Sequence, residues 1–403
     1  MQAPSRSLHH VIIGTGEAGL ACAMALREDG QENVVLIGAE EDAPYERPPL
    51  SKPSGGYHRP VALDLTGIVL RRGSSVTQID PADRYVMLSS GLRLHYDRLL
   101  IATGARARGL DCTGAEHALP LRNLSDARAI YARADTARAQ GASKAVIIGA
   151  GLIGLELAAE FTLRGMNVTV LEAGPRALGR AVPETLAQTI AQRHQRAGVA
   201  LQFGVSLAAI DDGGVHCTDG HHFPADVVIA AVGAEPEQKL AQSAGLACDN
   251  GILTDARLCT NDPAIFSAGD CARICHPRYG LMRFESWRMA CDQGRHAAAA
   301  MMGGDTAFAA LPWFWSDHYD LGLQAVGLHD PSRPAVVRPL EGGIIRFECA
   351  PNGELAAAQG LGQGNAIARD IRLAEMLIAR GIACDPDWLA DPNTSLKAAL
   401  RTP

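Results

Sequence analysis

Apolar residues along this chain gather in short runs, and one arrangement of runs occurs twice. In each copy a short apolar run predicts a buried strand, a glycine-rich turn follows, and an alanine- and leucine-rich segment predicts a helix before a second apolar strand. These parts fall at residues 10–13, 14–19, 20–26 and 34–37 in the first copy, and at 144–148, 149–154, 155–163 and 168–171 in the second. This order predicts two βαβ units with parallel strands, as in Rossmann-like dinucleotide-binding domains.

Other segments alternate between apolar and polar residues and predict smaller antiparallel sheets. They lie at residues 75–79, 85–88 and 92–95, at 215–217 and 222–223, and, before a helix at 366–380, at 343–347 and 354–358. The predicted fold class is therefore α/β, with two Rossmann-like domains in the arrangement of glutathione reductase and an α+β C-terminal domain. We expect the first dinucleotide-binding domain at residues 1–112 and 240–310, the second at 113–239, and the C-terminal domain at 311–403.

The glycine turns carry the first chemical signal, because each has the spacing Gly-x-Gly-x-x-Gly between a strand and a helix. The glycines are Gly14, Gly16 and Gly19 in the first unit, and Gly149, Gly151 and Gly154 in the second. The first glycine permits a tight turn, the second lets the backbone approach a pyrophosphate, and the third allows close packing of helix on strand. Free N–H groups at the start of the helix then meet the phosphates. Two such sites indicate one tightly held nucleotide and one that exchanges.

An acidic residue after the second unit's returning strand bears on which nucleotide binds there. Glu172 stands where a carboxylate accepts hydrogen bonds from the adenosine ribose hydroxyls, and a 2'-phosphate would meet a like charge, which favours NADH over NADPH. Arg176 and Arg180 lie nearby, and they either face solvent or bind the pyrophosphate. In the first unit the corresponding acid is Glu40, with the two acids that follow it as alternatives.

Composition narrows the function classes. The chain has 403 residues, of which 47% are hydrophobic and 20% charged, as in a globular enzyme of several domains. The formal net charge of -7 argues against a nucleic-acid partner, and no stretch reaches the roughly 18 apolar residues of a membrane span. The 10 cysteines are scattered without a Cys-x-x-Cys pair. We therefore expect no metal site and no membrane, and we expect a cytoplasmic protein with reduced thiols.

Several short segments outside the glycine turns carry a resemblance to a known family. They are residues 44–52 (PYERPPLSK), 102–104 (ATG), 121–124 (LRNL), 267–272 (SAGDCA), 285–287 (ESW) and 313–317 (WFWSD). With them, essentially the whole chain resembles the FAD-dependent ferredoxin reductases that serve bacterial oxygenases. The resemblance implies a tightly but non-covalently bound FAD, NADH as the exchanging substrate, and a 2Fe-2S ferredoxin as electron acceptor. That ferredoxin would feed a terminal oxygenase in aromatic hydrocarbon catabolism, either a Rieske dioxygenase or a cytochrome.

The resemblance also implies roles for individual residues. Asp270 would bind the ribityl chain of FAD, and Lys52 would lie beside the isoalloxazine ring, where a cation favours the anionic reduced flavin. Glu156 would pair with Lys52 near the nicotinamide, although a glutamate at a helix start is also favoured by the helix dipole alone. Arg47 and Arg122 would hold FAD through its phosphates.

The glycine turns and the resemblance together imply a full set of site residues. Lys52 and Glu156 are the expected catalytic residues. The expected FAD contacts are Gly14, Gly16, Glu17, Ala18, Gly19, Glu40, Arg47, Lys52, Val76, Ala102, Thr103, Gly104, Arg122, Gly269, Asp270, Glu285, Ser286, Trp287 and Trp315. The expected NADH contacts are Gly149, Gly151, Leu152, Ile153, Gly154, Glu156, Glu172, Arg180 and Gly233. Trp287 and Trp315 would pack near the flavin, or they belong to the core.

The sequence departs from the family pattern at two positions, and it lacks a feature of related enzymes. Ala39 stands where the family often has aspartate, so Glu40 would take over the ribose contact. His318 stands where many members have glutamine. It is either an ordinary polar substitution or, if it lies near the flavin or the docking surface, a source of pH dependence. No redox-active cysteine pair follows the first unit, and no cysteine lies within residues 45–52. Electrons would therefore pass from the flavin directly to an outside acceptor.

Other functions of the same fold stay open at this point. A rubredoxin reductase or an NADH oxidase would differ in the acceptor and in the oxygen consumed per NADH. An NADH-sensing flavoprotein of the apoptosis-inducing-factor type is another alternative, although we find neither a targeting segment nor long insertions. For docking, residues 271–296 carry Arg273, Arg278, Arg283, Arg288 and Arg295 against Glu285 and Asp292. We hypothesise that some of these arginines steer an acidic ferredoxin, unless they are scattered surface charge.

Overall fold

The computed structural model describes residues 8–52, 58–61, 65–141, 143–179 and 182–401. The chain divides into two compact units. The first comprises Met1–Arg47, His58–Arg106 and Ala234–Ala310, and the second comprises Pro48–Tyr57, Ala107–Gly233 and Leu311–Pro403. Each is described by itself below.

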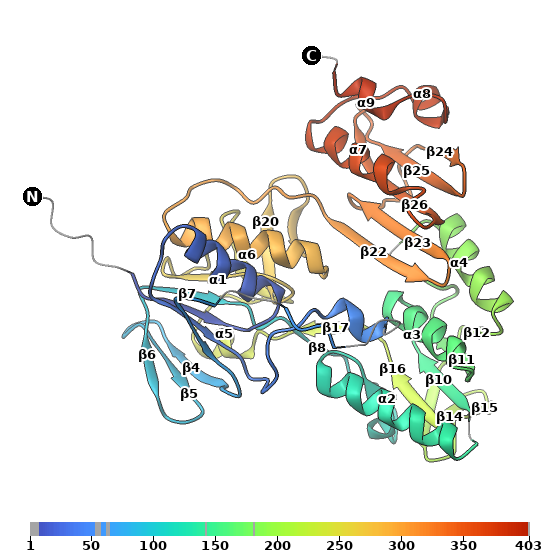
Figure 1. Cartoon of the computed structure of the whole chain (residues 1–403), viewed down its shortest axis with the longest axis horizontal. Coiled ribbons are helices and arrows are strands. Elements are labelled where there is room, and N and C mark those ends of the chain that lie inside the picture. Colours follow the sequence, from blue (N-terminus) through green and yellow to red (C-terminus); the bar gives the residue numbers. More distant parts are fainter. Residues whose placement is uncertain (1–7, 53–57, 62–64, 142, 180–181, 402–403) are drawn as a thin grey trace, which may run out of the picture. The chain divides into compact units, whose positions relative to one another are not determined.

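A parallel sheet of five strands forms the centre of the first unit (Figure 1). Its order is β19 (Ile265–Ser267), β7 (Arg98–Ile101), β1 (His10–Ile13), β2 (Val34–Ile37) and β3 (Ile68–Arg71). Ile12 on β1 pairs with Leu36 on one side and Leu100 on the other, and all three side chains are buried. Strands that are covered on both faces need such continuous apolar runs. This explains why the apolar runs in the sequence predicted these strands.

Helices α1 (Glu17–Glu28) and α6 (Trp287–Met301) pack against each other in the first unit. Gly294 on α6 makes this possible, because a Cβ atom there would lie 2.2 Å from the carbonyl oxygen of Ala18. The remaining strands form small sheets, and α5 (Lys239–Ser243) is short. These strands are β4 (Val76–Asp80), β5 (Tyr85–Leu88) and β6 (Arg93–His95); β8 (Ala105–Ala107) and β17 (Ala234–Pro236); and β18 (Ile252–Thr254), β20 (Ala272–His276) and β21 (Gly280–Arg283).

The second unit contains another parallel sheet of five strands. Its order is β12 (Ala200–Phe203), β11 (Asn167–Glu172), β10 (Lys144–Ile148), β16 (Val227–Ala230) and β9 (Leu119–Pro120). The helices here are α2 (Leu124–Ala139), α3 (Leu152–Leu163) and α4 (Glu184–Arg196), with the short turns η1 (Pro48–Ser51) and η3 (Ala115–His117). Strands β13 (Leu207–Asp211), β14 (Gly214–Cys217) and β15 (His222–Pro224) form a small antiparallel sheet.

The C-terminal part of the second unit is an antiparallel sheet with helix α7 (Ala368–Ala379) packed on β23 and β26 (Figure 1). Its order is β22 (Trp313–His318), β23 (Leu321–Val326), β26 (Leu355–Gln363), β25 (Gly343–Cys349) and β24 (Ala335–Leu340). Two short helices follow, α8 (Pro386–Ala390) and α9 (Leu396–Ala399). The predicted α/β fold class with an α+β C-terminal part is confirmed, whereas the exact domain boundaries stay a prediction.

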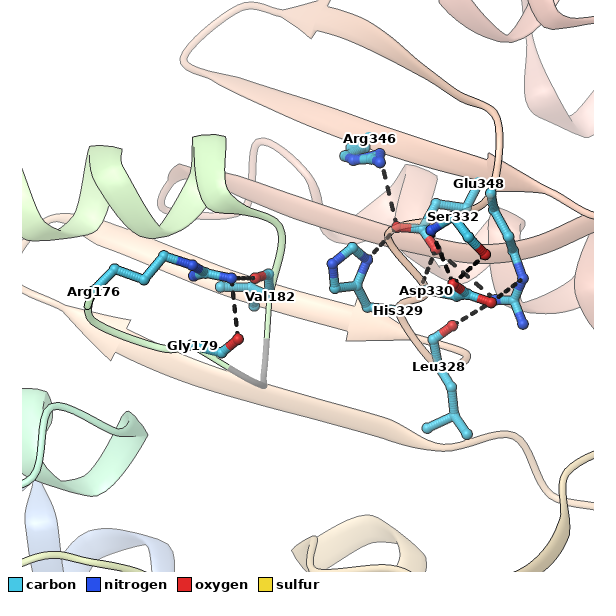
Figure 2. A network of polar contacts seen from close by, with 10 residues as sticks. Arg176, Gly179, Val182, Leu328, His329, Asp330, Ser332, Arg346 and Glu348 are labelled. Atoms are coloured by element: carbon cyan, nitrogen blue, oxygen red, sulfur yellow. Dashed lines mark hydrogen bonds and ion pairs between the residues drawn. The ribbon is translucent and has the colours of Figure 1, made fainter. Parts of the chain in front are cut away.

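Two buried polar clusters stabilise this C-terminal sheet. The wholly buried guanidinium of Arg338 donates to the carbonyl oxygens of Leu389 (2.7 Å) and Trp388 (3.1 Å), which attaches the last helices to β24. Figure 2 shows the second cluster, in which the buried Glu348 carboxylate accepts from His329 Nδ1 at 2.5 Å and lies 3.7 Å from Arg346. Because buried charges cost free energy unless they are paired, both clusters favour a single arrangement of these strands.

Helix starts differ from the prediction in an informative way. The second helix was expected from residue 155, but α3 begins at Leu152, directly after Gly151. Glu172 likewise is the last residue of β11 rather than the residue after the strand. In the described part of the chain, no helix is both long enough and apolar enough to cross a membrane.

Candidate functional site

The glycine turn of the first unit is a backbone cradle that larger residues would fill. Gly14 has φ +113°, and a Cβ atom on it would lie 2.1 Å from the carbonyl oxygen of Ala102. A Cβ atom on Gly19 would lie 1.9 Å from the carbonyl oxygen of Gly14. Gly16 is the N-cap of α1, and no side chain caps the helix there. The free N–H groups at the start of α1 therefore fit a phosphate, as the dinucleotide motif requires.

The glycine turn of the second unit repeats this geometry. Gly149 has φ +106°, and its Cβ atom would lie 2.4 Å from the carbonyl oxygen of Ala231. Gly154 could not carry a Cβ atom either, since it would lie 2.0 Å from the carbonyl oxygen of Gly149. Gly151 caps α3 without a side-chain hydrogen bond, and no atom lies within 4 Å of where its Cβ atom would be. The second turn therefore fits a second dinucleotide.

Glu172 lies against this second turn. Its two carboxylate oxygens accept hydrogen bonds from the backbone N–H groups of Ala150 (2.8 Å) and Gly174 (2.7 Å). These bonds fix the carboxylate at the end of β11, beside the glycine turn, which is where an adenosine ribose binds in this motif. They hold a negative charge in place that would repel a 2'-phosphate.

Arg176 is occupied by the backbone of its own loop. Its guanidinium donates to the carbonyl oxygens of Ala177 (3.2 Å), Leu178 (3.3 Å), Gly179 (3.1 Å) and Val182 (3.3 Å). Figure 2 shows the bonds to Gly179 and Val182. An arginine held in this way stabilises its loop. Arg180 lies outside the described residues.

Three residues expected at the first nucleotide, Gly16, Glu40 and Arg47, lie close together. The Glu40 carboxylate accepts from the hydroxyl of Tyr45 (2.6 Å) and from the guanidinium of Arg47 (3.1 Å). The guanidinium of Arg47 also lies 3.8 Å from where a Cβ atom of Gly16 would be. Arg47 is therefore at the glycine turn, in a position that fits a phosphate contact.

The start of α1 gathers further expected residues of the first unit. A Cβ atom on Gly269 would lie 3.0 Å from the Cβ atom of Ala18. Burial raises the pKa of Glu17, and hydrogen bonds from Cys291 and Trp287 oppose that rise. Ser286 caps α6 by accepting from the N–H of Met289 at 3.3 Å, so Trp287 is the first residue of that helix. These contacts bring the segments around residues 102, 269 and 286 to the first glycine turn.

The other expected residues have places in the fold that do not by themselves show a nucleotide contact. Thr103 donates its hydroxyl to the carbonyl oxygen of Glu237 (2.6 Å), and the carbonyl oxygen of Asp270 accepts from Arg283 (3.2 Å). Val76 is on β4. Arg122 belongs to the second unit, where its N–H donates to Asp126 at the start of α2 (2.8 Å). Gly104, Leu152, Ile153, Gly233 and Glu285 flank the segments already described. Their contacts with a nucleotide stay predictions.

The predicted pair of Lys52 and Glu156 forms a salt bridge in the second unit, with Nζ and Oε1 3.2 Å apart. Lys52 Nζ also lies 2.9 Å from a carboxylate oxygen of Asp317 and 4.9 Å from the centre of the Trp315 ring. The hydroxyls of Ser51 and Ser316 donate to the two oxygens of Glu156, each at 2.5 Å. The segments around residues 52, 156 and 315 thus meet at one cluster, which we name the Glu156 cluster: Ser51, Lys52, Glu156, Trp315, Ser316 and Asp317.

Sequence reasoning did not assign roles to Ser51, Ser316 and Asp317. The two serines do lie in segments that carried the family resemblance, directly before Lys52 and directly after Trp315. Burial raises the pKa of the Glu156 carboxyl, whereas Lys52, Ser316 and Ser51 all oppose the rise by stabilising the ionised form.

His318, which departs from the family pattern, is wholly buried. Its Nδ1 atom lies 3.3 Å from Nε2 of His194 on α4, and His194 is wholly buried as well. The neighbouring residue on α4, Arg193, forms an ion pair with Asp320, with Nε 2.6 Å from a carboxylate oxygen. His318 therefore joins β22 to α4 within the second unit.

Comparisons with known proteins agree with this geometry. Residues 8–294 match the family of pyridine nucleotide-disulphide oxidoreductases, and residues 313–400 match the reductase C-terminal family. The anthranilate 1,2-dioxygenase system ferredoxin–NAD(+) reductase component of Burkholderia cepacia is 39% identical, over 97% of this chain and 98% of that protein. Putidaredoxin reductase of Pseudomonas putida is 37% identical, over 81% of this chain and 82% of its own.

Solved structures give the same picture. A ferredoxin reductase from Rhodopseudomonas palustris is 33% identical, with a TM-score of 0.90 over 97% of this chain and 99% of that one. The covalent putidaredoxin reductase–putidaredoxin complex contains a chain that is 33% identical, with a TM-score of 0.88 over 98% of both chains.

Proposed function

This chain belongs to the pyridine nucleotide-disulphide oxidoreductase family, and from that premise we propose that it is an FAD-dependent NADH:ferredoxin reductase. Bound FAD supplies the acceptor for a hydride from NADH and the donor for single-electron steps to a 2Fe-2S ferredoxin, which in turn feeds an oxygenase. The observation that carries the proposal is the pair of glycine cradles, one in each unit, in a chain that is 39% identical to a ferredoxin–NAD(+) reductase component.

The absence of cysteine from residues 45–52 separates this activity from thiol chemistry within the same family. Residues 48–52 contribute Ser51 and Lys52 to the Glu156 cluster instead. The protein therefore delivers electrons to an outside acceptor rather than through its own disulfide. Together with the similarity of the chain to ferredoxin reductases, the missing cysteine favours a ferredoxin as acceptor over the rubredoxin, oxidase and sensor alternatives.

NADH is the proposed electron donor. The Glu172 carboxylate is held beside the second glycine turn by two backbone N–H groups, and the Arg176 guanidinium is committed to carbonyl oxygens of its own loop. A 2'-phosphate would therefore meet a fixed negative charge without Arg176 to pair with it.

The residues of the chain have distinct proposed tasks. Arg47 and the free N–H groups of α1 would hold the FAD phosphates, and Asp270 would bind its ribityl hydroxyls. With FAD bound, the Lys52 ammonium, oriented by Glu156, would stabilise negative charge on the reduced ring, as the family resemblance implies. Trp315, whose ring lies 4.9 Å from Lys52 Nζ, excludes water from that side of the cation.

The ferredoxin docking surface is a further part of the proposal. Among the five arginines of residues 271–296, Arg283 lies 2.5 Å from Glu285, Arg288 lies 3.8 Å from Asp292, and Arg273 pairs with Asp249. Arg295 also has an acidic partner, Glu28 at 3.2 Å, but its side chain is 53% exposed. Because its side chain is more exposed than those of Arg273, Arg283 and Arg288, Arg295 is the one of these four paired arginines best suited to steer an acidic partner.

Anaerobic stopped-flow of the FAD-loaded protein tests the proposal. We expect NADH to bleach the flavin absorbance, and an oxidised 2Fe-2S ferredoxin to restore it. Bleaching without restoration by any ferredoxin, together with oxygen consumption close to one per NADH, would establish the oxidase instead. No bleaching by NADH would overturn the donor assignment. The downstream oxygenase, its organic substrate and the cytoplasmic location stay predictions.

A further inference from the structure

The carboxylate of Glu156 is held at both of its oxygens by hydroxyl groups from distant parts of the chain. The hydroxyl of Ser51, at the end of η1, donates to Oε2, and that of Ser316, on β22, donates to Oε1. Glu156 is 6% exposed, Ser51 5% and Ser316 0%. Water therefore contributes little to the solvation of this carboxylate, and the two serines take its place.

Lys52 alone does not balance the charge of Glu156. Its ammonium is shared with Asp317, whose side chain is 55% exposed, and the bond to Asp317 at 2.9 Å is shorter than that to Glu156 at 3.2 Å. A buried carboxylate that shares its counter-ion with a second carboxylate takes up a proton more readily, unless other hydrogen-bond donors stabilise its ionised form. The two hydroxyls are those donors.

We propose that Ser51 and Ser316 are positioning residues for hydride transfer: they keep Glu156 ionised, and Glu156 in turn keeps the Lys52 ammonium at its place in the cluster. Without them, Glu156 would accept a proton within the working pH range, and the neutral carboxyl would release Lys52 toward Asp317. The two serines thus set the acid limit of NADH oxidation. This inference rests on the proposed function for its catalytic part only.

Other titratable groups that face the cluster do not account for this limit. Asp317 is the exposed partner of Lys52. Tyr131 on α2 donates its hydroxyl to the carbonyl oxygen of Leu50 (3.0 Å). From β22 and α4, the imidazoles of His318 and His194 lie nearby, and burial lowers the pKa of both. Burial thus favours the neutral form of both imidazoles, so neither adds a positive charge beside Glu156.

The test compares Ser51→Ala and Ser316→Ala with Ser243→Ala. Ser243 on α5 also donates its hydroxyl, but to the carbonyl oxygen of Lys239 at 3.0 Å, so it controls for loss of a serine hydroxyl as such. The rate of flavin bleaching by NADH is measured as a function of pH in the FAD-loaded proteins. In addition, the infrared C=O band of a protonated carboxyl is titrated in the same proteins before and after FAD removal, and Glu156→Gln assigns that band.

We expect each serine variant to move the acid limb of the rate to higher pH by about one unit, which is a tenfold change in proton affinity. The infrared titration of Glu156 should move by the same amount, while at alkaline pH the rate returns to that of the wild type. Ser243→Ala should move neither. A rate lowered by one factor at every pH, or an infrared titration that does not move, would overturn the proposal.

The test still gives an answer if one serine variant does not fold, or if NADH does not bleach the flavin. If Ser316→Ala does not fold, Ser51→Ala carries the same expectation, because it removes the donor to the other oxygen. If NADH does not bleach the flavin of the wild type, the proposed function fails, but the infrared titration still decides whether the serines hold Glu156 ionised.

Discussion

Acidification is expected to loosen α4 from β22, because His194 and His318 are buried where neither can be solvated as a cation. Burial lowers the pKa of His194 from 6.5 to about 4, and that of His318 falls as well. A group whose pKa is lower in the folded state contributes stability that is fully present above its unfolded pKa and is lost as the pH falls. The loss should therefore run from pH 6.5 down to about pH 4.

The size of the effect follows from the shift. A difference of about 2.5 pH units for His194, at 1.36 kcal/mol per unit, corresponds to about 3 kcal/mol, of which about 2.5 kcal/mol is lost between pH 7 and pH 4.5. His318 acts in the same direction. This is a large part of the stability of an ordinary domain.

The matched perturbation is His194→Gln, in which an amide nitrogen can take the place of Nε2 but no group titrates. Hydrogen exchange followed by mass spectrometry, corrected for intrinsic exchange, reports the opening free energy of peptides from α4 and β22 at each pH. We expect His194→Gln to remove most of the acid-dependent loss, and His222→Gln, at an exposed imidazole of the same unit, to leave it intact. If His194→Gln loses protection as steeply as the wild type, the reasoning is refuted.

Three further predictions concern the nucleotide turns and the C-terminal sheet. Glu172→Ala should reduce the preference for NADH over NADPH by roughly tenfold without reversing it, since Arg176 stays bound to its loop, as measured by kcat/KM for both coenzymes. Gly149→Ala would place a Cβ atom 2.4 Å from the carbonyl oxygen of Ala231, and it should abolish NADH binding in an equilibrium titration while the FAD content is unchanged. Arg338→Met leaves buried carbonyl oxygens unpaired and should lower the free energy of unfolding in urea by about 3 kcal/mol.

The two βαβ units were predictable because their signals are local. The apolar runs at residues 10–13 and 144–148 coincide with β1 and β10, and both are central strands buried on both faces. The position of the helix starts was less accessible, since the last three residues of the second motif already form the first turn of α3. Propensity alone does not say whether a glycine ends a turn or begins a helix.

The Glu156 cluster could be predicted only in part. A resemblance linked Lys52 to Glu156, and Ser51 and Ser316 lie in segments that carried it. Nothing in the sequence, however, pairs the two serines with Glu156, which lies 105 and 160 residues away. Serine is ordinary at the end of a turn and on a strand, and the meaning of these hydroxyls comes from the buried carboxylate between them. The pairing of His318 with His194, 124 residues away, was hidden for the same reason.

Strand β22 also determines where the sequences of two related proteins can be joined in a chimera. It lies within the stretch matched by the reductase C-terminal family, yet Ser316, Asp317 and His318 bind Glu156, Lys52 and His194 outside that stretch. Asp320 adds a bond to Arg193. A chimera that takes its C-terminal region from a relative should therefore be joined after Asp320. The chimera then keeps β22 together with the residues of this chain that β22 binds, and only the segment from β23 onward comes from the relative.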